Sequence, residues 1–154
     1  MNYHRIIIVG ETNLIRSFMA GVILRGLLQK NSGEPIKVFS RGTVVLFSEP
    51  VAPKAAAVVT RHGYDIKDFR SSQISQEDIN SADLVLAMNQ NIYEKLKSDY
   101  DISQTSCMSI STFLGIEANV PAIKEDTEEA YESCFTSIEQ LMEAVAEKII
   151  VEVL

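Results

Sequence analysis

The chain contains few cysteines and no long apolar run, and both absences limit what it can be. Cys107 and Cys134 could pair, but nothing in the sequence indicates secretion, so we expect free, buried thiols. Its apolar runs, such as residues 6–9 and 44–47, are far shorter than the roughly 20 residues of a membrane-spanning helix. Residues 1–5 lead into a predicted strand without the apolar segment of a signal peptide. We therefore expect a cytoplasmic protein with no membrane partner.

Basic residues are also scarce. The 154 residues include 14 Lys and Arg against 21 Asp and Glu, which gives a net charge of -7. Nucleic-acid binding depends on a basic face, so we expect no nucleic-acid partner. The hydrophobic fraction of 46% and the charged fraction of 23% are typical of a globular protein. The length predicts a single domain over residues 1–154 that folds without metals or disulfides, and we expect no cofactor.

Predicted strands and helices alternate along the chain. The strand segments are short apolar runs at residues 5–9, 36–40, 83–88 and 107–110. The helical segments are residues 17–29, a helix from Pro53 that stops at Gly63, a short helix capped by Ser75 and Asp78, residues 90–97, and residues 125–151. A turn is expected at residues 31–35. This alternation predicts an α/β fold, with a parallel sheet and right-handed crossovers.

The most informative segment is the loop after the first predicted strand. The strand ends at Gly10, and the next helix begins around Arg16 and Ser17. Loop amides and a helix N-terminus converge on an anion in such a geometry. Open α/β sheets also bind ligands at the carboxyl ends of their strands. A purely structural interpretation stays open, because Gly10 and Asn13 both tolerate backbone conformations that a tight turn needs.

This loop resembles the Cys-x5-Arg-Ser loop of low molecular weight protein tyrosine phosphatases, with Gly10 at the position of the cysteine. The resemblance extends over nearly the whole chain. The further matching segments follow in the family's order: Ser40-Arg41-Gly42-Thr43, Pro50-Val51-Ala52-Pro53, His62-Gly63-Tyr64-Asp65, Phe69-Arg70-Ser71-Ser72-Gln73 and Ala82-Asp83-Leu84-Val85-Leu86-Ala87-Met88. The resemblance implies a three-layer α/β fold of the phosphotyrosine protein phosphatase I type, with a four-stranded parallel sheet flanked by helices.

The resemblance also implies a reaction whose residues are missing here. In the family a cysteine thiolate attacks phosphorus, an aspartate protonates the leaving oxygen and an arginine binds the phosphate oxygens. Gly10 stands at the nucleophile position and Ala122 at the general-acid position. Glycine forms no phosphoenzyme and alanine supplies no proton. Glu125 and Asp126 are interpreted as acids of the first turn of the last helix, so no catalytic residue is expected.

What remains resembles a phosphate-binding loop without its chemistry. The remnant consists of Glu11, Thr12, Asn13, Leu14, Ile15, Arg16 and Ser17, with Ser40 as loop support. Thr12, Phe18 and Phe69 replace a glycine, a proline and a histidine of the family. Two interpretations of Arg16 stay open: it pairs with Glu11 or a backbone carbonyl, or it still binds anions. Glu11 either folds toward Arg16 or points outward.

Three functions are compatible with these residues. The first is a pseudophosphatase that binds a phosphorylated or acidic protein segment, or that docks to a kinase or an active phosphatase. The second is a phosphatase or related hydrolase with an unorthodox nucleophile such as water, although loss of one member of a catalytic set already removes most of the rate. The third is a structural or oligomerising domain, and the sequence leaves the oligomeric state open.

Overall fold

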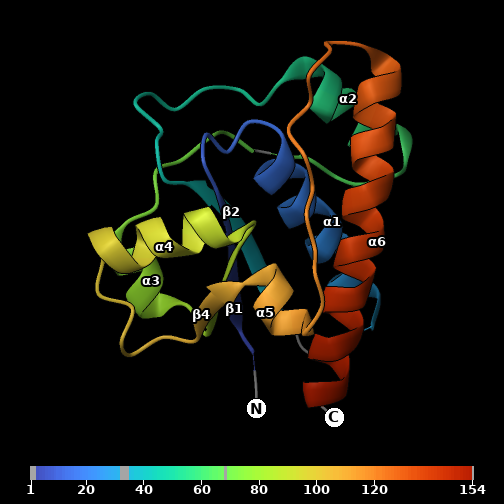
Figure 1. The fold of residues 1–154 in the computed structure, drawn as a ribbon. Helices are drawn as coiled ribbons and strands as arrows, with labels where there is room; N and C mark the ends of the chain where they lie inside the picture. The colour runs from blue at the N-terminus through green and yellow to red at the C-terminus, as the bar shows by residue number, and fades with distance from the viewer. Residues whose placement is uncertain (1–2, 32–34, 68, 154) are drawn as a thin grey trace.

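The computed structural model describes residues 3–31, 35–67 and 69–153. Within these residues a four-stranded parallel sheet lies between two layers of helices (Figure 1). Its strands, in the spatial order β2-β1-β3-β4, are β1 (Arg5–Gly10), β2 (Lys37–Gly42), β3 (Leu84–Ala87) and β4 (Cys107–Ser109). This arrangement confirms the predicted α/β fold with a four-stranded parallel sheet.

The central strand β1 is buried on both faces because its sequence is apolar throughout. Residues 6–9 are Ile-Ile-Ile-Val, and each is 0% exposed. β-Branched side chains fit a pleated surface, and parallel strands covered on both faces have continuous apolar runs of this kind. β1 pairs with β2 along its whole length, up to Gly10 opposite Gly42, and both strands end one or two residues beyond their predicted limits.

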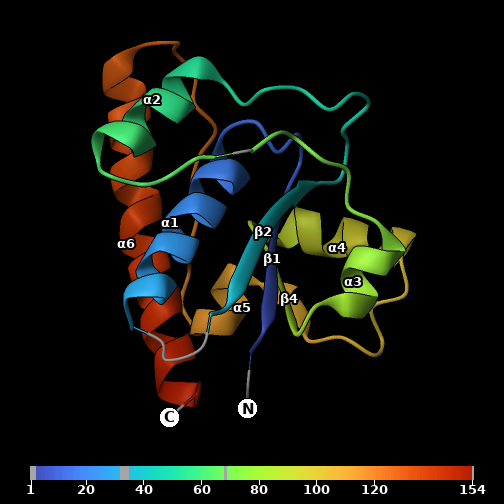
Figure 2. The same cartoon turned by 180° about the vertical axis from the view of Figure 1, so that it is seen from behind.

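One face of the sheet is covered by α1 (Arg16–Asn31), α2 (Pro53–Arg61), α5 (Ile110–Leu114) and α6 (Glu128–Val153), and the other by α3 (Gln76–Ser81) and α4 (Gln90–Asp99) (Figures 1 and 2). The long helix α6 lies against α1 and α2. Apolar residues from the two sides form two separate clusters, one on each face of the sheet. No helix of the described residues is long and apolar enough to cross a bilayer.

Several helix ends follow the predicted signals. Pro53 stands at the start of α2, where its missing N–H is no loss, and Gly63, with φ 88°, follows the end of that helix. The backbone N–H of Asp78 donates to Ser75 Oγ at 3.0 Å, and the Ser75 N–H donates to Asp78 Oδ2 at 3.1 Å. This pair confirms the capping box at α3, with aspartate in place of the usual Glu or Gln.

The predicted limits of the last helix are wrong at its N-terminus. The helix α6 begins at Glu128, so Glu125 and Asp126 precede it, and the acids of its first turn are Glu128 and Glu129. Thr127 sets this boundary, because its side-chain oxygen accepts a hydrogen bond from the Ala130 N–H at 3.2 Å. The short helix α5 had no predicted counterpart. Residues 32–34 of the expected turn lie outside the described residues.

Candidate functional site

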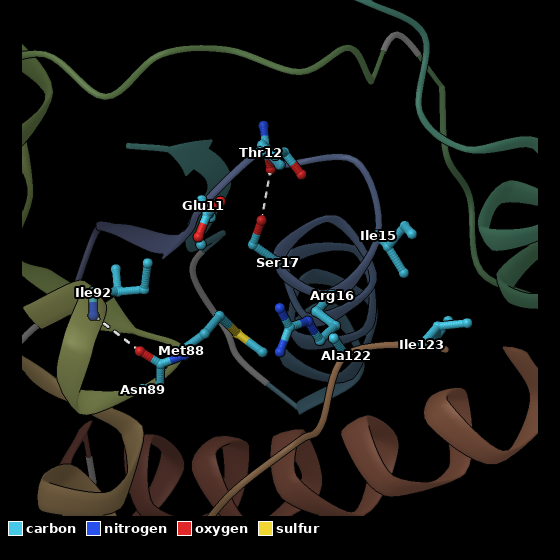
Figure 3. Close-up of a pocket in the computed structure, with 12 residues that line it drawn as sticks. Glu11, Thr12, Ile15, Arg16, Ser17, Met88, Asn89, Ile92, Ala122 and Ile123 are labelled. Atoms are coloured by element: carbon cyan, nitrogen blue, oxygen red, sulfur yellow. Dashed lines mark hydrogen bonds between the residues drawn. The ribbon is translucent and has the colours of Figure 1, made fainter. Parts of the chain in front are cut away.

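The loop after β1 opens a small pocket at the carboxyl end of the sheet (Figure 3). The loop runs from Gly10, the last residue of β1, to Arg16, the first residue of α1. The pocket has a volume of about 150 Å³. Its lining consists of Gly10, Glu11, Thr12, Asn13, Ile15, Arg16, Ser17, Met88, Asn89, Ile92, Ala122 and Ile123. Leu14 and Ser40 are the two residues of the predicted remnant and its support that do not line it.

A buried chain of hydrogen bonds holds the loop in shape. The Ser17 hydroxyl donates to Asn13 Oδ1 at 3.0 Å, and Asn13 Nδ2 donates to the Ser40 carbonyl oxygen at 3.2 Å. Asn13 and Ser17 are only 3% and 2% exposed, so their polar groups need these partners. Asn13 has φ 61°, a left-handed conformation that asparagine tolerates better than most residues. Asn13 and Ser17 therefore point into the protein, and the contact with Ser40 confirms the predicted support of the loop.

The amides of the loop are left without acceptors. In the described part of the chain, no backbone or side-chain oxygen accepts a hydrogen bond from the amides of residues 11–18. The first amide in this region with a partner is that of Met19, which donates to the Ile15 carbonyl at 2.9 Å. Such amides at the N-terminus of a long helix carry a partial positive charge. The loop therefore has the donors that an anion requires.

Arg16 binds a backbone carbonyl and not Glu11. Its guanidinium donates to the Val120 carbonyl at 2.8 Å and lies beside Met88 and Ala122 (Figure 3). None of the ion pairs among the described residues joins Arg16 to Glu11, which is exposed. Of the two arrangements left open for Glu11, the one that pairs it with Arg16 is not found among the described residues. Glu11 lines the pocket without binding Arg16, and the hydrogen bond from Arg16 to Val120 ties the loop to the segment before α6.

Ser17 leaves no space for a side chain at position 10. A Cβ atom built on Gly10 would lie 2.8 Å from both Cβ and Oγ of Ser17. Real Cβ atoms do not approach other carbon atoms this closely, so any side chain at this position requires a shift of α1 or of the loop. The Thr43 N–H donates to the Gly10 carbonyl at 3.0 Å and fixes this backbone against the end of β2.

The opposite wall of the pocket is apolar. Ala122 and Ile123 reach it from the segment before α6, and Met88 and Ile92 from the end of β3 and from α4. Among the described lining residues Glu11 carries the only carboxylate, and none carries a thiol or an imidazole. Asp126 lies apart from the lining and forms an ion pair with Lys54 at 3.1 Å. Its role is to link α2 to the start of α6.

Both cysteines are free thiols, as predicted, and both lie away from the pocket lining. Cys134 is buried on α6, but Cys107, on β4, is only half-buried, which corrects the expectation for that residue. Burial raises the pKa of the Cys107 thiol to about 11. Burial also raises the pKa of Cys134, with Arg16 opposing the change. Neither group is a thiolate at neutral pH.

Two of the departures from the family pattern contact each other. Phe18 and Phe69 pack edge to face, with ring centroids 5.5 Å apart and planes at 72°. Arg25 also lies over the ring of Phe69, 4.7 Å from its centroid. Because aromatic rings favour this geometry, the two replacements form one contact that supports the start of α1.

The sequence did not indicate the part of the pocket that lies at the end of β3 and the start of α4. Met88, Asn89 and Ile92 reach the site because β3 lies next to β1, and the Met88 N–H donates to the Val9 carbonyl at 2.9 Å. Strand order is not visible in the spacing of the segments. The one available signal was the end of the third predicted strand at Met88, since parallel strands end at a common edge.

Comparison with known proteins gives a consistent family. Residues 5–153 match the model of the low molecular weight phosphotyrosine protein phosphatase family. A probable low molecular weight protein-tyrosine-phosphatase, EpsP of Ralstonia nicotianae, is 27% identical over 139 residues, which cover 90% of this chain and 91% of the relative. The protein of the same name from Ralstonia solanacearum is 36% identical over 83 residues, 54% of each chain.

Solved structures share the fold along nearly the full length. The low molecular weight protein tyrosine phosphatase of T. tengcongensis has a TM-score of 0.85 and 28% identity, with 94% of this chain and 99% of that chain covered. The YwlE arginine phosphatase of Geobacillus stearothermophilus also has a TM-score of 0.85, at 25% identity, covering 98% of this chain and 95% of its own. The tyrosine phosphatase Wzb of Escherichia coli K30, solved with sulphate, has a TM-score of 0.81 at 22% identity, covering 96% and 99%.

Proposed function

The chain belongs to the low molecular weight phosphotyrosine protein phosphatase family, and from that premise we propose that it is a non-catalytic member. In this proposal the loop of residues 10–17 is a phosphate-binding loop that recognises an anion and does not react with it. Its biological ligand is a phosphorylated or acidic segment of a partner protein, such as a kinase or an active phosphatase.

The observation that carries the proposal is the closure of position 10. By resemblance this position belongs to the nucleophile, yet it has no side chain, and Ser17 lies within 2.8 Å of where a Cβ would stand. Ala122 lines the pocket where a general acid is required, and its methyl group has no proton to give. The described lining residues contain no thiol or imidazole in place of the missing pair. A covalent phosphoenzyme therefore has no cysteine on which to form, and the Ser17 hydroxyl is already bonded to Asn13 Oδ1, with no base bonded to it among the described residues.

Retained anion binding is supported by the donors of the loop. The amides of residues 11–18 have no acceptor among the described residues, and they lie at the N-terminus of α1. Amides at a helix N-terminus that have no protein acceptor are available to an anion, which can accept hydrogen bonds from several of them at once. Arg16 holds its guanidinium at the same pocket through the Val120 carbonyl. We take this as support for binding over a purely structural role.

An activity assay tests the proposal directly. We expect no hydrolysis above background for para-nitrophenyl phosphate, a phosphotyrosine peptide or a phosphoarginine substrate. The last is included because a structural relative, YwlE, is an arginine phosphatase. In parallel, calorimetry with inorganic phosphate is expected to detect binding that Arg16→Ala removes. Turnover that survives purification and disappears in Arg16→Ala would overturn the non-catalytic assignment.

Restoring the missing pair provides a second test. Gly10→Cys combined with Ala122→Asp is expected to give at most feeble activity, because the new Cβ meets Ser17 and because Glu11 and Thr12 remain in the loop. The matched control is Gly10→Ser with Ala122→Asp, which adds nearly the same volume without a thiol. Robust activity of the cysteine variant alone would show that the loss is confined to two residues.

The second candidate function is a phosphatase that uses water as its nucleophile. The names of the EpsP relatives, probable low molecular weight protein-tyrosine-phosphatases, favour it. Glu11 is the carboxylate of the pocket lining that could accept a proton from water in such a reaction. Hydrolysis that Glu11→Gln abolishes and that leaves no phosphoenzyme would establish this alternative.

A further inference from the structure

A second, basic cavity lies along the outer edge of the sheet. It has a volume of about 440 Å³ and shares no lining residue with the loop pocket. One side is β2, the edge strand of the sheet, and the other is the chain between α2 and α3, which crosses past α1 and the end of β2 (Figure 2). Four cationic side chains line it: Arg25, Arg41, Lys67 and Arg70. Such a concentration is unusual in a chain with 14 basic residues and a net charge of -7.

Within the described residues, few carboxylates oppose the charge of these side chains. No Asp or Glu is found among the described residues that line the cavity. Arg41 alone of the four has a carboxylate partner among the described residues, Asp78 at 3.1 Å. Asp78 is shared, because Arg5 also lies 3.9 Å from it. Three cations therefore face the cavity without a described counter-charge, an arrangement that lowers the energy of a bound anion.

Neutral groups hold two of the three arginines, Arg25 and Arg70, in place. Arg70 donates to the Ser48 carbonyl at 2.9 Å and to the Ser48 hydroxyl at 3.3 Å. Arg25 donates to the Asp65 carbonyl and stacks on Phe69. Arginines that are positioned by carbonyls and rings keep their charge available, and the remaining N–H groups of each fork are free to bind oxygen pairs of a ligand. The site is ordered before any ligand arrives, which lowers the entropic cost of binding.

We propose that this cavity binds a diphosphate group. Guanidinium groups match the paired oxygens of phosphate, and the hydroxyls of Ser48 and Ser72 add donors at the rim. The multiple negative charge of a diphosphate matches several uncompensated cations better than a single carboxylate does. The group is either free inorganic diphosphate or the diphosphate of a nucleotide. This inference is independent of the loop pocket and of its chemistry.

Calorimetry on the full chain with inorganic pyrophosphate at low salt tests the proposal. The double variant Lys67→Gln/Arg70→Gln is expected to weaken binding at least tenfold, and both side chains are exposed, so the fold is retained. The double variant Lys95→Gln/Lys97→Gln removes the same charge from α4, outside the cavity, and is expected to change the affinity less than twofold. Arg16→Ala is expected to leave pyrophosphate binding in place.

Each other result decides against the site. Loss of binding in Arg16→Ala, with no effect of Lys67→Gln/Arg70→Gln, assigns the diphosphate to the loop pocket. If both double variants weaken pyrophosphate binding equally, the binding depends on net charge and not on this cavity. If the titration shows no saturable heat at millimolar pyrophosphate, the proposal is wrong. A second titration with ADP separates the two sources. Affinity at least equal to that of pyrophosphate supports a nucleotide, and weaker binding supports the free ion.

Discussion

Two segments face each other across the candidate pocket, and they retain the features of the family's site to different degrees. The loop of residues 10–17 retains a buried hydrogen-bonded skeleton, in which Ser17 bonds to Asn13 and Asn13 to the Ser40 carbonyl. The segment of residues 120–123 contributes a carbonyl, a methyl group and an apolar side chain. The loop of residues 10–17 has the shape of an anion-binding loop. Residues 120–123 contact this loop but supply no reactive group.

The difference shows that the shape of such a loop and its chemistry depend on separate residues. Shape comes from backbone amides and from side chains that are buried and must be satisfied, so it survives the loss of exposed groups. Chemistry depends on side chains at single positions, and each can be lost without unfolding the protein. The comparison between the two segments yields four expectations, ordered from the largest effect to the smallest.

The largest effect is expected from breaking the skeleton. Asn13→Ala removes both hydrogen bonds of the side chain and leaves a residue that strains at φ 61°. We expect the free energy of unfolding to fall by about 2–4 kcal/mol, from the orphaned buried groups and the left-handed conformation together. Urea denaturation followed by circular dichroism measures it. Asn13→Gly, which tolerates the backbone but loses the same bonds, is the matched control and is expected to lose less. A change within about 0.5 kcal/mol for alanine, the usual range of surface substitutions, would contradict the role of the skeleton.

The second largest effect is expected from removing the charge of Arg16, which joins the two segments. Arg16→Ala deletes the guanidinium that lies at the pocket and binds the Val120 carbonyl. Phosphate affinity measured by calorimetry is expected to fall by the value of a charge-assisted hydrogen bond, about 1.5–3 kcal/mol. Arg16→Lys keeps the charge but loses the paired N–H groups of the guanidinium, so its phosphate affinity is expected to lie between those of the original chain and Arg16→Ala. Unchanged phosphate affinity in Arg16→Ala would mean that the amides alone bind the anion.

The closed packing at position 10 predicts a coupling between two residues. Gly10→Ala is expected to destabilise the protein by about 1–3 kcal/mol, because its Cβ overpacks against Ser17. Ser17→Gly costs stability through the lost bond to Asn13, but it removes the clash. The double variant is therefore expected to be more stable than the sum of the single effects, by at least about 1 kcal/mol in a double-mutant cycle. Strict additivity would show that the loop relaxes freely around a new side chain.

The smallest effect is expected at Glu11. This carboxylate is exposed and has no ion pair with Arg16 among the described residues, so it acts on an anion only through solvent. Charges about 4 Å apart in water interact by about 1 kcal/mol, so Glu11→Gln is expected to raise phosphate affinity about fivefold. The increase is expected to vanish at high salt. Glu147→Gln, an equally exposed change on α6, is the control. A tenfold gain that persists in salt would restore the view that Glu11 competes for the pocket.

Much of the fold was predictable because its signals are local. The Ile-Ile-Ile-Val run predicts a buried central strand, Pro53 predicts the start of α2, and Ser75 with Asp78 predicts the capping box of α3. The helix α5 was missed because it has five residues, about one turn, in which periodicity cannot register. The start of α6 was misplaced because Glu125 and Asp126 suit a first turn as well as Glu128 and Glu129 do, and Thr127 decided the boundary.

The candidate site divides in the same way. The family resemblance implied that Ser40 supports the loop, and Asn13 was expected to tolerate the backbone of a tight turn; both are confirmed. The partner of Arg16 was not predictable, since Val120 is 104 residues away and its backbone carbonyl carries no sequence signal. The contact between Phe18 and Phe69 was equally hidden, and two separate replacements proved to be one packing unit.

The sequence by itself determined how strands and helices alternate along the chain, the loop that bends at Asn13, and the absence of a side chain at Gly10. These properties reside in single residues or in short periodic runs. Only the tertiary structure decided that Ser17 closes the space beside Gly10, that Arg16 binds the Val120 carbonyl, and that four cations gather at the edge of β2. These outcomes depend on how distant segments pack, because burial and charge are set by neighbours in space that the linear sequence does not specify.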